Sequence, residues 1–287
     1  MTLRALSALA LALLASACSP THFVNALASR DGYTLHSAAY GQDPRQQLDI
    51  YQPTAAQFSH AAPIIVFFYG GSWQNGDRAD YRFAGAALAS QGFVVVIPDY
   101  RVYPQVQWPT FLQDSAQATE WAHAHAAEYG ANPHKLFLMG HSAGAYNAAM
   151  LALDRQYLDA QTPTPWQPAG LIGLAGPYDF LPLTDPKLIA VFGQHATDPA
   201  TQPITHASKT APPALLITGD ADRIVNPANT TALAAKLRSL GVPVEEHHYP
   251  DIGHLVLAGS LTRPFRGQAD TLEKITTFVK ACCAGPS

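Results

Sequence analysis

The sequence is poor in charged residues and in cysteine. Only 13% of its 287 residues are charged, against about 25% in an average soluble domain, and the formal net charge is −4. We therefore expect no nucleic-acid partner, because no basic excess is present to neutralise phosphates. Three cysteines are too few for a disulfide framework, and no Cys/His spacing typical of a metal site occurs. A glycine-rich phosphate loop is also missing, so we expect no metal and no cofactor.

The N-terminal segment resembles a signal peptide. Arg4 precedes an uninterrupted run of Ala, Leu and Ser over residues 5–17, which is too short to span a bilayer. The sequence ASAC at residues 15–18 fits cleavage after an Ala-x-Ala, and it also resembles the lipobox of bacterial lipoproteins, in which the cysteine is lipidated. We expect export, with Cys18 as an anchor to the outer membrane, or release into the periplasm or medium. A buried N-terminal helix is the third interpretation.

Residues 18–287 are expected to form one α/β domain, because apolar runs alternate with segments of helical spacing. Runs such as IIVFF and FVVVI are typical of parallel strands that are buried on both faces. Strands are expected at residues 33–40, 47–51, 64–69, 93–97, 135–139, 171–175, 214–218 and 244–249. Helices are expected at residues 81–90, 110–129, 143–154, 227–240 and 270–281. The proline-rich stretches 161–168 and 199–213 are expected at the surface, and the second could shape a pocket mouth.

A GxSxG motif follows one of these strands directly. Residues 140–144 read GHSAG and open an alanine-rich helical segment, which is the context of a nucleophile elbow. The small neighbours permit a strained turn that exposes the Ser142 hydroxyl. The alternative, a tight turn in which Ser142 caps the helix, is disfavoured by this position. The helix N-terminus would place the N–H of Ala143 beside a developing oxyanion.

A serine nucleophile needs a histidine base and an orienting carboxylate, in the chain order Ser, acid, His. Asp222 follows the strand at 214–218 and is the preferred acid. Asp220 leaves the strand earlier and is expected to anchor the turn through backbone N–H groups. The remaining carboxylate candidates are Asp251 and Asp179.

His254 is the expected base, because it lies in a loop after the last strand. The carboxyl ends of parallel strands share one edge of the sheet, so this loop and that of Asp222 should converge. Other histidines lie within predicted elements and are expected to serve packing or the surface: His123, His125, His247 and His248.

The oxyanion donors are expected in the loop YGGSW at residues 69–73, which follows the strand IIVFF. Glycines let the backbone approach a substrate carbonyl closely. We assign the oxyanion hole to the N–H groups of Gly71, Ser72 and Ala143. The alternative is a plain glycine turn.

These pieces resemble the α/β-hydrolase carboxylesterases, in the group of kynurenine formamidases, prenylcysteine methylesterases and bacterial feruloyl-esterase-like proteins. The resemblance rests on QLDIYQP, YGGSW, PDYRVYP, GHSAG, GDADRIV and the terminal His254, which span almost the whole mature chain. It implies an eight-stranded, mostly parallel sheet with helices on both faces, a Ser142–His254–Asp222 triad, and structural bracing by residues 99–101. The family usually has His where this chain has Tyr69, and the tyrosine hydroxyl could replace its hydrogen bonds.

The resemblance implies a serine esterase that cleaves small to medium acyl or aryl esters through an acyl-enzyme, with a small-molecule ester as its partner. An amide hydrolase of the arylformamidase type is one alternative, and a binding module that retains the fold is another. No insertion is long enough for a large cap, which favours an open site. The aromatic candidates for an apolar pocket are Tyr100, Tyr103, Trp108, Tyr146 and Phe192.

Overall fold

The computed structural model describes residues 24–25, 31–54, 61–263 and 265–284. The predicted signal segment and Cys18 lie outside the described residues. Eight strands of the described chain form one sheet: β1 (Tyr33–Ala39), β2 (Gln47–Pro53), β3 (Ala62–Phe68), β4 (Val94–Pro98), β5 (Ala131–His141), β6 (Gly170–Leu174), β7 (Ala214–Gly219) and β8 (Val244–Tyr249). Their order across the sheet is β1-β2-β4-β3-β5-β6-β7-β8.

The sheet is parallel from β4 to β8 and antiparallel at one edge. β1 pairs antiparallel with β2, and β2 pairs antiparallel with β4. The five pairs that follow are parallel, with registers such as Val66↔Leu138 and Leu216↔Glu246. The carboxyl ends of β3, β5, β6, β7 and β8 therefore meet along one edge of the sheet. The predicted eight-stranded, mostly parallel sheet is confirmed.

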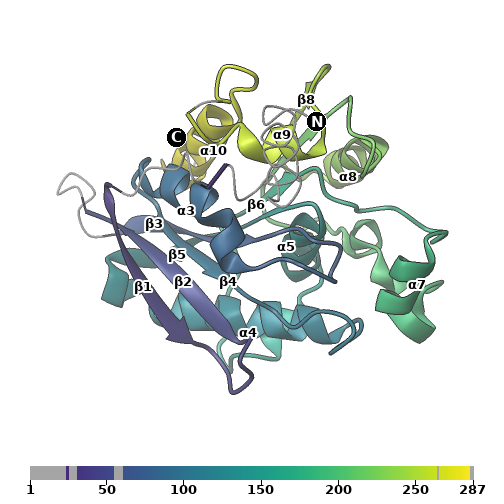
Figure 1. Cartoon of the computed structure of the whole chain (residues 1–287), viewed down its shortest axis with the longest axis horizontal. Helices are drawn as coiled ribbons and strands as arrows, with labels where there is room; N and C mark the ends of the chain where they lie inside the picture. Colours follow the sequence, from purple (N-terminus) through teal and green to yellow (C-terminus); the bar gives the residue numbers. More distant parts are fainter. Residues whose placement is uncertain (1–23, 26–30, 55–60, 264, 285–287) are drawn as a thin grey trace, which may run out of the picture.

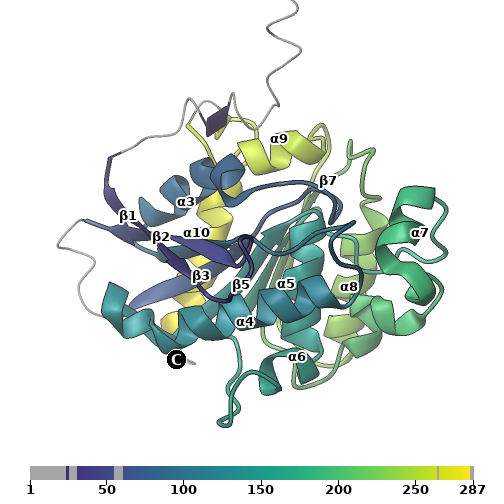
Figure 2. The same ribbon diagram turned by 60° about the horizontal axis from the view of Figure 1, so that its bottom comes forward.

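Helices cover both faces of the sheet (Figures 1 and 2). One face carries α3 (Arg82–Ala89) and α10 (Thr271–Ala284), and the other carries α4 (Thr110–Ala124), α5 (Ala143–Leu153) and α8 (Ala228–Ser239). The central strands are covered from both sides, so every residue of β4, β6 and β7 is buried. This burial explains the continuous apolar runs in their sequences.

Shorter helices complete the fold, and several were not predicted. α6 (Gln156–Asp159), α7 (Pro186–Phe192) and α9 (His254–Gly259) lie in segments that show no clear helical spacing over their four to seven residues. The predicted helix at 110–129 instead ends at Ala124 and is followed by a separate 3-10 turn, Ala126–Tyr129. Short helices are fixed by tertiary contacts more than by their own periodicity.

The segment between β6 and β7 is the longest excursion on the site edge of the sheet. It contains α7 and three 3-10 turns, Gly193–His195, Pro199–Thr201 and Pro203–His206. α7 extends to one side of the sheet (Figure 1). Among the residues that the structure describes, no helix is long and apolar enough to cross a membrane.

Candidate active site

Ser142 occupies a sharp turn between β5 and α5. Its backbone dihedrals are φ 57° and ψ −126°, a region that non-glycine residues rarely adopt and that costs on the order of 1–3 kcal/mol. Its N–H donates to the carbonyl of Leu174 at 2.9 Å, which fixes the turn against β6. The side chain makes no capping hydrogen bond to α5. The helix-capping interpretation of Ser142 is therefore wrong.

The two glycines of GHSAG are required by close packing. A Cβ on Gly144 would lie 2.0 Å from the carbonyl oxygen of Phe68, at the end of β3. A Cβ on Gly140 would lie 2.2 Å from the carbonyl of Gly144. The first turn of α5 is therefore pressed against two strand ends, and this packing sets the position of Ser142.

Asp222 and His254 form a buried pair. The Asp222 Oδ2 lies 2.6 Å from the His254 Nδ1, and their side chains are 0% and 5% exposed. The other carboxylate oxygen accepts the N–H groups of Ile224 at 2.8 Å and Val225 at 2.9 Å. An ionised carboxylate only accepts, so the proton of the imidazole lies on Nδ1 and the Nε2 lone pair is left free.

The other carboxylates take no part in this pair. Asp220 does not anchor the turn as expected, because its Oδ1 instead pairs with His248 Nδ1 at 2.6 Å on the protein surface. Asp222 itself supplies the backbone-anchoring bonds of that turn. Asp179 and Asp251 are exposed, and neither forms a hydrogen bond with His254. His254 also differs from its predicted loop position, since it is the first residue of α9.

The loop after β3 approaches Ser142 through its glycines. A Cβ on Gly70 would lie 2.9 Å from the Ser142 Cβ, and a Cβ on Gly71, where φ is 133°, would lie 2.1 Å from the carbonyl oxygen of Asn75. Ser72 and Trp73 also have positive φ values, of 53° and 57°. The N–H groups of Gln74 and Asn75 both donate to the Gly71 carbonyl at 3.0 Å, so these residues form a tight turn.

The expected oxyanion donors are available for a ligand. Within the described residues, the N–H groups of Gly71, Ser72 and Ala143 donate to no protein acceptor. The N–H of Gly70 is instead used internally, at 3.4 Å from the Tyr81 hydroxyl. Unpaired N–H groups are the feature that an oxyanion hole needs.

Tyr69 holds this loop with its hydroxyl. The hydroxyl donates to Asp99 Oδ1 at 2.9 Å and accepts from Arg45 Nη2 at 2.9 Å. The hydroxyl of Tyr100 donates to the Tyr69 carbonyl at 2.8 Å. Arg78 forms an ion pair with Asp99. The Tyr69 hydroxyl therefore steadies the loop by hydrogen bonds, and Asp99 and Tyr100 act as bracing.

His141 is a second buried histidine at this edge, which the sequence interpretation left without a role. Its ring lies 4.6 Å from the ring of His254, centroid to centroid. Burial, together with the neighbouring His254, lowers the pKa of His141 to about 3. Two charged imidazoles at this separation would repel by about 3.6 kcal/mol at an effective dielectric constant near 20. A neutral His141 avoids that repulsion whenever His254 carries a proton.

A cavity of about 710 Å³ opens beside Ser142. Residues from four segments line it: 72–75, 142–143, 177–188 and 224–229. The wall therefore comes from the stretch before and within α7, and the expectation that residues 199–213 shape the mouth is wrong. None of the five predicted aromatic residues lines it: Tyr100, Tyr146 and Phe192 are fully buried in the core, and the partly buried Tyr103 and Trp108 lie outside its wall. Trp73 and Phe180 supply the aromatic surface instead.

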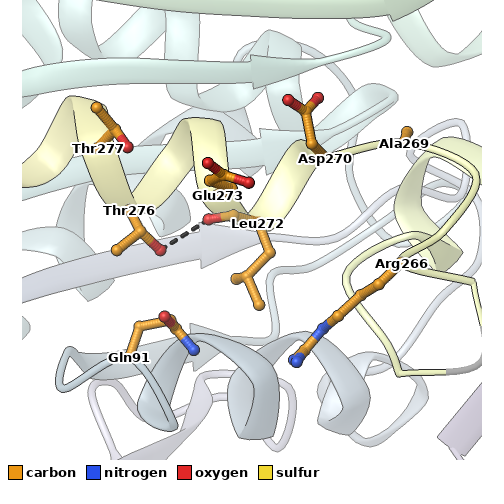
Figure 3. A pocket seen from close by; sticks show the side chains of 8 residues that line it. All are labelled: Gln91, Arg266, Ala269, Asp270, Leu272, Glu273, Thr276 and Thr277. Atoms are coloured by element: carbon orange, nitrogen blue, oxygen red, sulfur yellow. Dashed lines mark hydrogen bonds between the residues drawn. The ribbon is translucent and has the colours of Figure 1, made fainter.

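A second cavity, of about 300 Å³, lies between α10 and the turn that follows α3 (Figure 3). Gln91, Arg266 and Glu273 are among its lining residues, and none of the residues described above contributes to it. In the described part of the chain, no group of three or more His, Cys, Asp and Glu side chains could hold a metal ion. Cys282 and Cys283 are free thiols.

The sequence from β2 to the end of α8 matches a known family, BD-FAE, over residues 48–237. The chain belongs to the BD-FAE family. The prolyl oligopeptidase family also matches residues 193–285. The fold is that of the α/β-hydrolases, and the resemblance inferred from the motifs is confirmed.

Individual relatives are esterases. The chain is 29% identical to esterase LipC of Mycobacterium tuberculosis over 240 residues, which cover 77% of this chain and 57% of LipC. It is 31% identical to a probable isoprenylcysteine alpha-carbonyl methylesterase of Arabidopsis thaliana over 158 residues, which cover 53% of this chain and 33% of the relative. The chain thus spans about half of one relative and a third of the other.

A solved esterase structure is also similar to this chain. The butyrate-bound esterase of the planctomycete Thermogutta terrifontis superposes with a TM-score of 0.71 at 25% identity, covering 88% of this chain and 94% of that chain. These relatives and this solved structure are named as esterases, and the structure shares the fold of this chain.

Proposed function

We propose that this protein is a serine hydrolase of carboxylic esters, with Ser142 as nucleophile, His254 as base and Asp222 as the orienting acid. The buried Asp222–His254 pair at 2.6 Å is the observation that carries the proposal. A histidine held in this way has one free nitrogen, and the next expected contact is the hydroxyl of Ser142. The strained backbone of Ser142 supports the same role, because such strain persists where function requires it.

The reaction follows from these groups. The Ser142 Oγ attacks the ester carbonyl while its proton moves to His254 Nε2, and the resulting oxyanion accepts the N–H groups of Gly71, Ser72 and Ala143. His254 then gives the proton to the leaving alcohol as the carbon–oxygen bond breaks. A water molecule, deprotonated by His254, attacks the acyl-enzyme and releases the carboxylic acid. Asp222 stabilises the imidazolium at each proton transfer.

We propose small to medium acyl or aryl esters as substrates. The cavity beside Ser142 is large enough for both parts of such an ester, and its wall mixes apolar groups such as Trp73 and Phe180 with polar ones. The butyrate bound to the Thermogutta terrifontis esterase supports a short acyl group. A series of p-nitrophenyl esters of increasing chain length tests this proposal, and activity confined to long chains would contradict it.

A fluorophosphonate probe tests the nucleophile. We expect one covalent label on the wild-type protein and none on Ser142→Ala. Ser239→Ala is the matched control, because Ser239 is an exposed serine at the end of α8. A label that survives Ser142→Ala would refute the assignment. An unlabelled but folded wild-type protein would favour the binding-module alternative.

The amide-hydrolase alternative predicts a different substrate preference. Hydrolysis of N-formylkynurenine faster than p-nitrophenyl acetate, compared by kcat/KM, would favour an arylformamidase over an esterase. We also propose export as one domain, residues 18–287, with a lipid on Cys18. Mass spectrometry of the mature N-terminus tests this, and an unmodified Cys18 would contradict the anchor.

A further inference from the structure

The inference concerns His141, which the hydrolysis steps proposed above do not use. His141 is 1% exposed and directly precedes Ser142 in the chain. Both of its ring nitrogens are engaged: Nδ1 lies 2.9 Å from the Tyr81 hydroxyl, and Nε2 lies 3.1 Å from the backbone carbonyl of His254. Buried polar atoms are generally hydrogen-bonded, and here the two partners of one ring belong to two separate segments of the site.

These partners fix the tautomer of His141. A carbonyl oxygen only accepts, so Nε2 must carry the proton, and Nδ1 must accept the hydrogen of the Tyr81 hydroxyl. The Tyr81 oxygen in turn accepts the N–H of Gly70 at 3.4 Å. Burial raises the pKa of Tyr81 to about 12, so its hydroxyl keeps the hydrogen that this chain of bonds requires.

The chain of bonds joins three separate parts of the site. Gly70 belongs to the loop that carries the oxyanion donors, His141 ends the strand that carries Ser142, and His254 begins α9. α9 has only six residues, and two of them, Leu255 and Val256, are 47% and 37% exposed. A helix this short depends on such contacts for its position. The Asp222 bond orients the His254 ring, and the His141 bond holds the His254 backbone.

We propose that His141 is a positioning residue that sets the distance between His254 and Ser142. Through its hydrogen bond with Tyr81, it also fixes the position of the oxyanion loop relative to these two residues. This inference rests on the proposed triad. A displacement of about 1 Å in a reacting group costs up to about 100-fold in rate, so loss of the link should reduce kcat more than substrate binding.

Two amide variants separate the two bonds of His141. The amide of His141→Gln reaches the position of Nε2 and can still donate to the His254 carbonyl. The amide of His141→Asn reaches only the position of Nδ1 and meets Tyr81 alone. We expect His141→Asn to lower kcat for p-nitrophenyl acetate by about 30-fold or more with KM within about 2-fold, and His141→Gln to recover most of that loss.

Tyr81→Phe tests the far end of the link and keeps the ring in place. We expect a fall in kcat of about 10-fold, because Gly70 and His141 each lose a partner while the His254 bond remains. Tyr157→Phe is the matched control, since it removes the same atom from a buried tyrosine on α6 and should leave kcat unchanged. If the His141 variants fail to fold, kcat of Tyr81→Phe still tests the inference.

Equal kcat for His141→Asn, His141→Gln and the wild-type protein would overturn the inference. So would rate losses that match the fraction of unfolded protein, measured by circular dichroism, since they would reflect stability alone. A failure of the triad itself looks different: the wild-type protein would then show no fluorophosphonate label on Ser142.

Discussion

Replacement of Tyr69 by Phe removes one buried hydroxyl from the support of the oxyanion loop. Two bonds to charged groups are lost, the one to Asp99 and the one from Arg45. The ring should keep its stacking against Tyr100 at 4.8 Å between centroids. Arg45 retains the carbonyls of Tyr100 at 3.0 Å and Gly76 at 2.9 Å, and Asp99 retains Arg78. The perturbation is therefore confined to one atom and its two charged partners.

The loss can be estimated from these bonds. A hydrogen bond to a charged group contributes about 1.5–3 kcal/mol, and the two bonds share one hydroxyl, so we expect Tyr69→Phe to lower the free energy of unfolding by about 2–3 kcal/mol at pH 7. Burial raises the pKa of Asp99 above its usual value of 3.8, and the Tyr69 hydroxyl opposes that rise by stabilising the ionised form.

The sign of the pH dependence follows from this. A carboxyl whose pKa is raised in the folded state contributes stability at low pH, and that stability is lost as the pH rises through the folded pKa. Tyr69→Phe raises the folded pKa of Asp99 further. The additional decrease in the free energy of unfolding therefore appears at neutral pH, where Asp99 is ionised. The difference between the two proteins should therefore shrink as the pH falls toward the ordinary carboxyl range.

Urea unfolding of both proteins at pH 7 and at the lowest pH where the wild-type protein is folded measures this difference. A difference below about 0.5 kcal/mol at pH 7 would refute the assigned role of the hydroxyl, because even one bond to a charged group should contribute more. A difference that stays equal at both pH values would show that Asp99 ionisation is not involved.

Three further predictions concern the site. Asp222→Asn should lower kcat by about 10³–10⁴-fold without unfolding the protein, because an amide facing His254 favours the wrong tautomer; steady-state kinetics checks this. Gly144→Ala should cost at least about 2 kcal/mol in urea unfolding, because its Cβ would meet Phe68 at 2.0 Å, and an unchanged midpoint would contradict this packing. His248→Gln should leave kcat/KM within about 2-fold, since His248 lies at the surface, and a large loss would reopen the choice of base.

The sheet could be predicted because burial on both faces leaves a direct trace in the sequence. β4 and β7 read as continuous apolar runs for this reason, and each of the eight strands lies where an apolar or alternating run predicted one. α9 left no such trace. Its six residues are too few for a period of 3.6 to be recognised, and its position depends on contacts made by distant parts of the chain.

Site residues at strand ends could also be predicted from the sequence, whereas those fixed by tertiary contacts could not. Ser142, Asp222 and the loop at 69–73 stand at strand ends, so local sequence was enough to nominate them. The turn-anchoring role was assigned to Asp220, but the Asp222 carboxylate accepts the backbone N–H groups and Asp220 pairs with His248, because both residues suit a turn and only the fold decides which one faces inward. The wall formed by residues 177–188 carries no motif and could not be predicted.

The proposed catalytic groups are fixed by buried hydrogen bonds, whereas the wall of the cavity is more exposed. Tyr69 and His141 tie the oxyanion loop and α9 to the sheet through buried hydrogen bonds. The wall at residues 177–188 includes exposed side chains such as Asp179 and Asp185, and it lies in the longest excursion on this edge of the sheet. Loops on a rigid scaffold tolerate sequence change better than the scaffold does. Variation in this wall can therefore alter which substrate binds, while Ser142, His254 and the proposed oxyanion donors keep their positions.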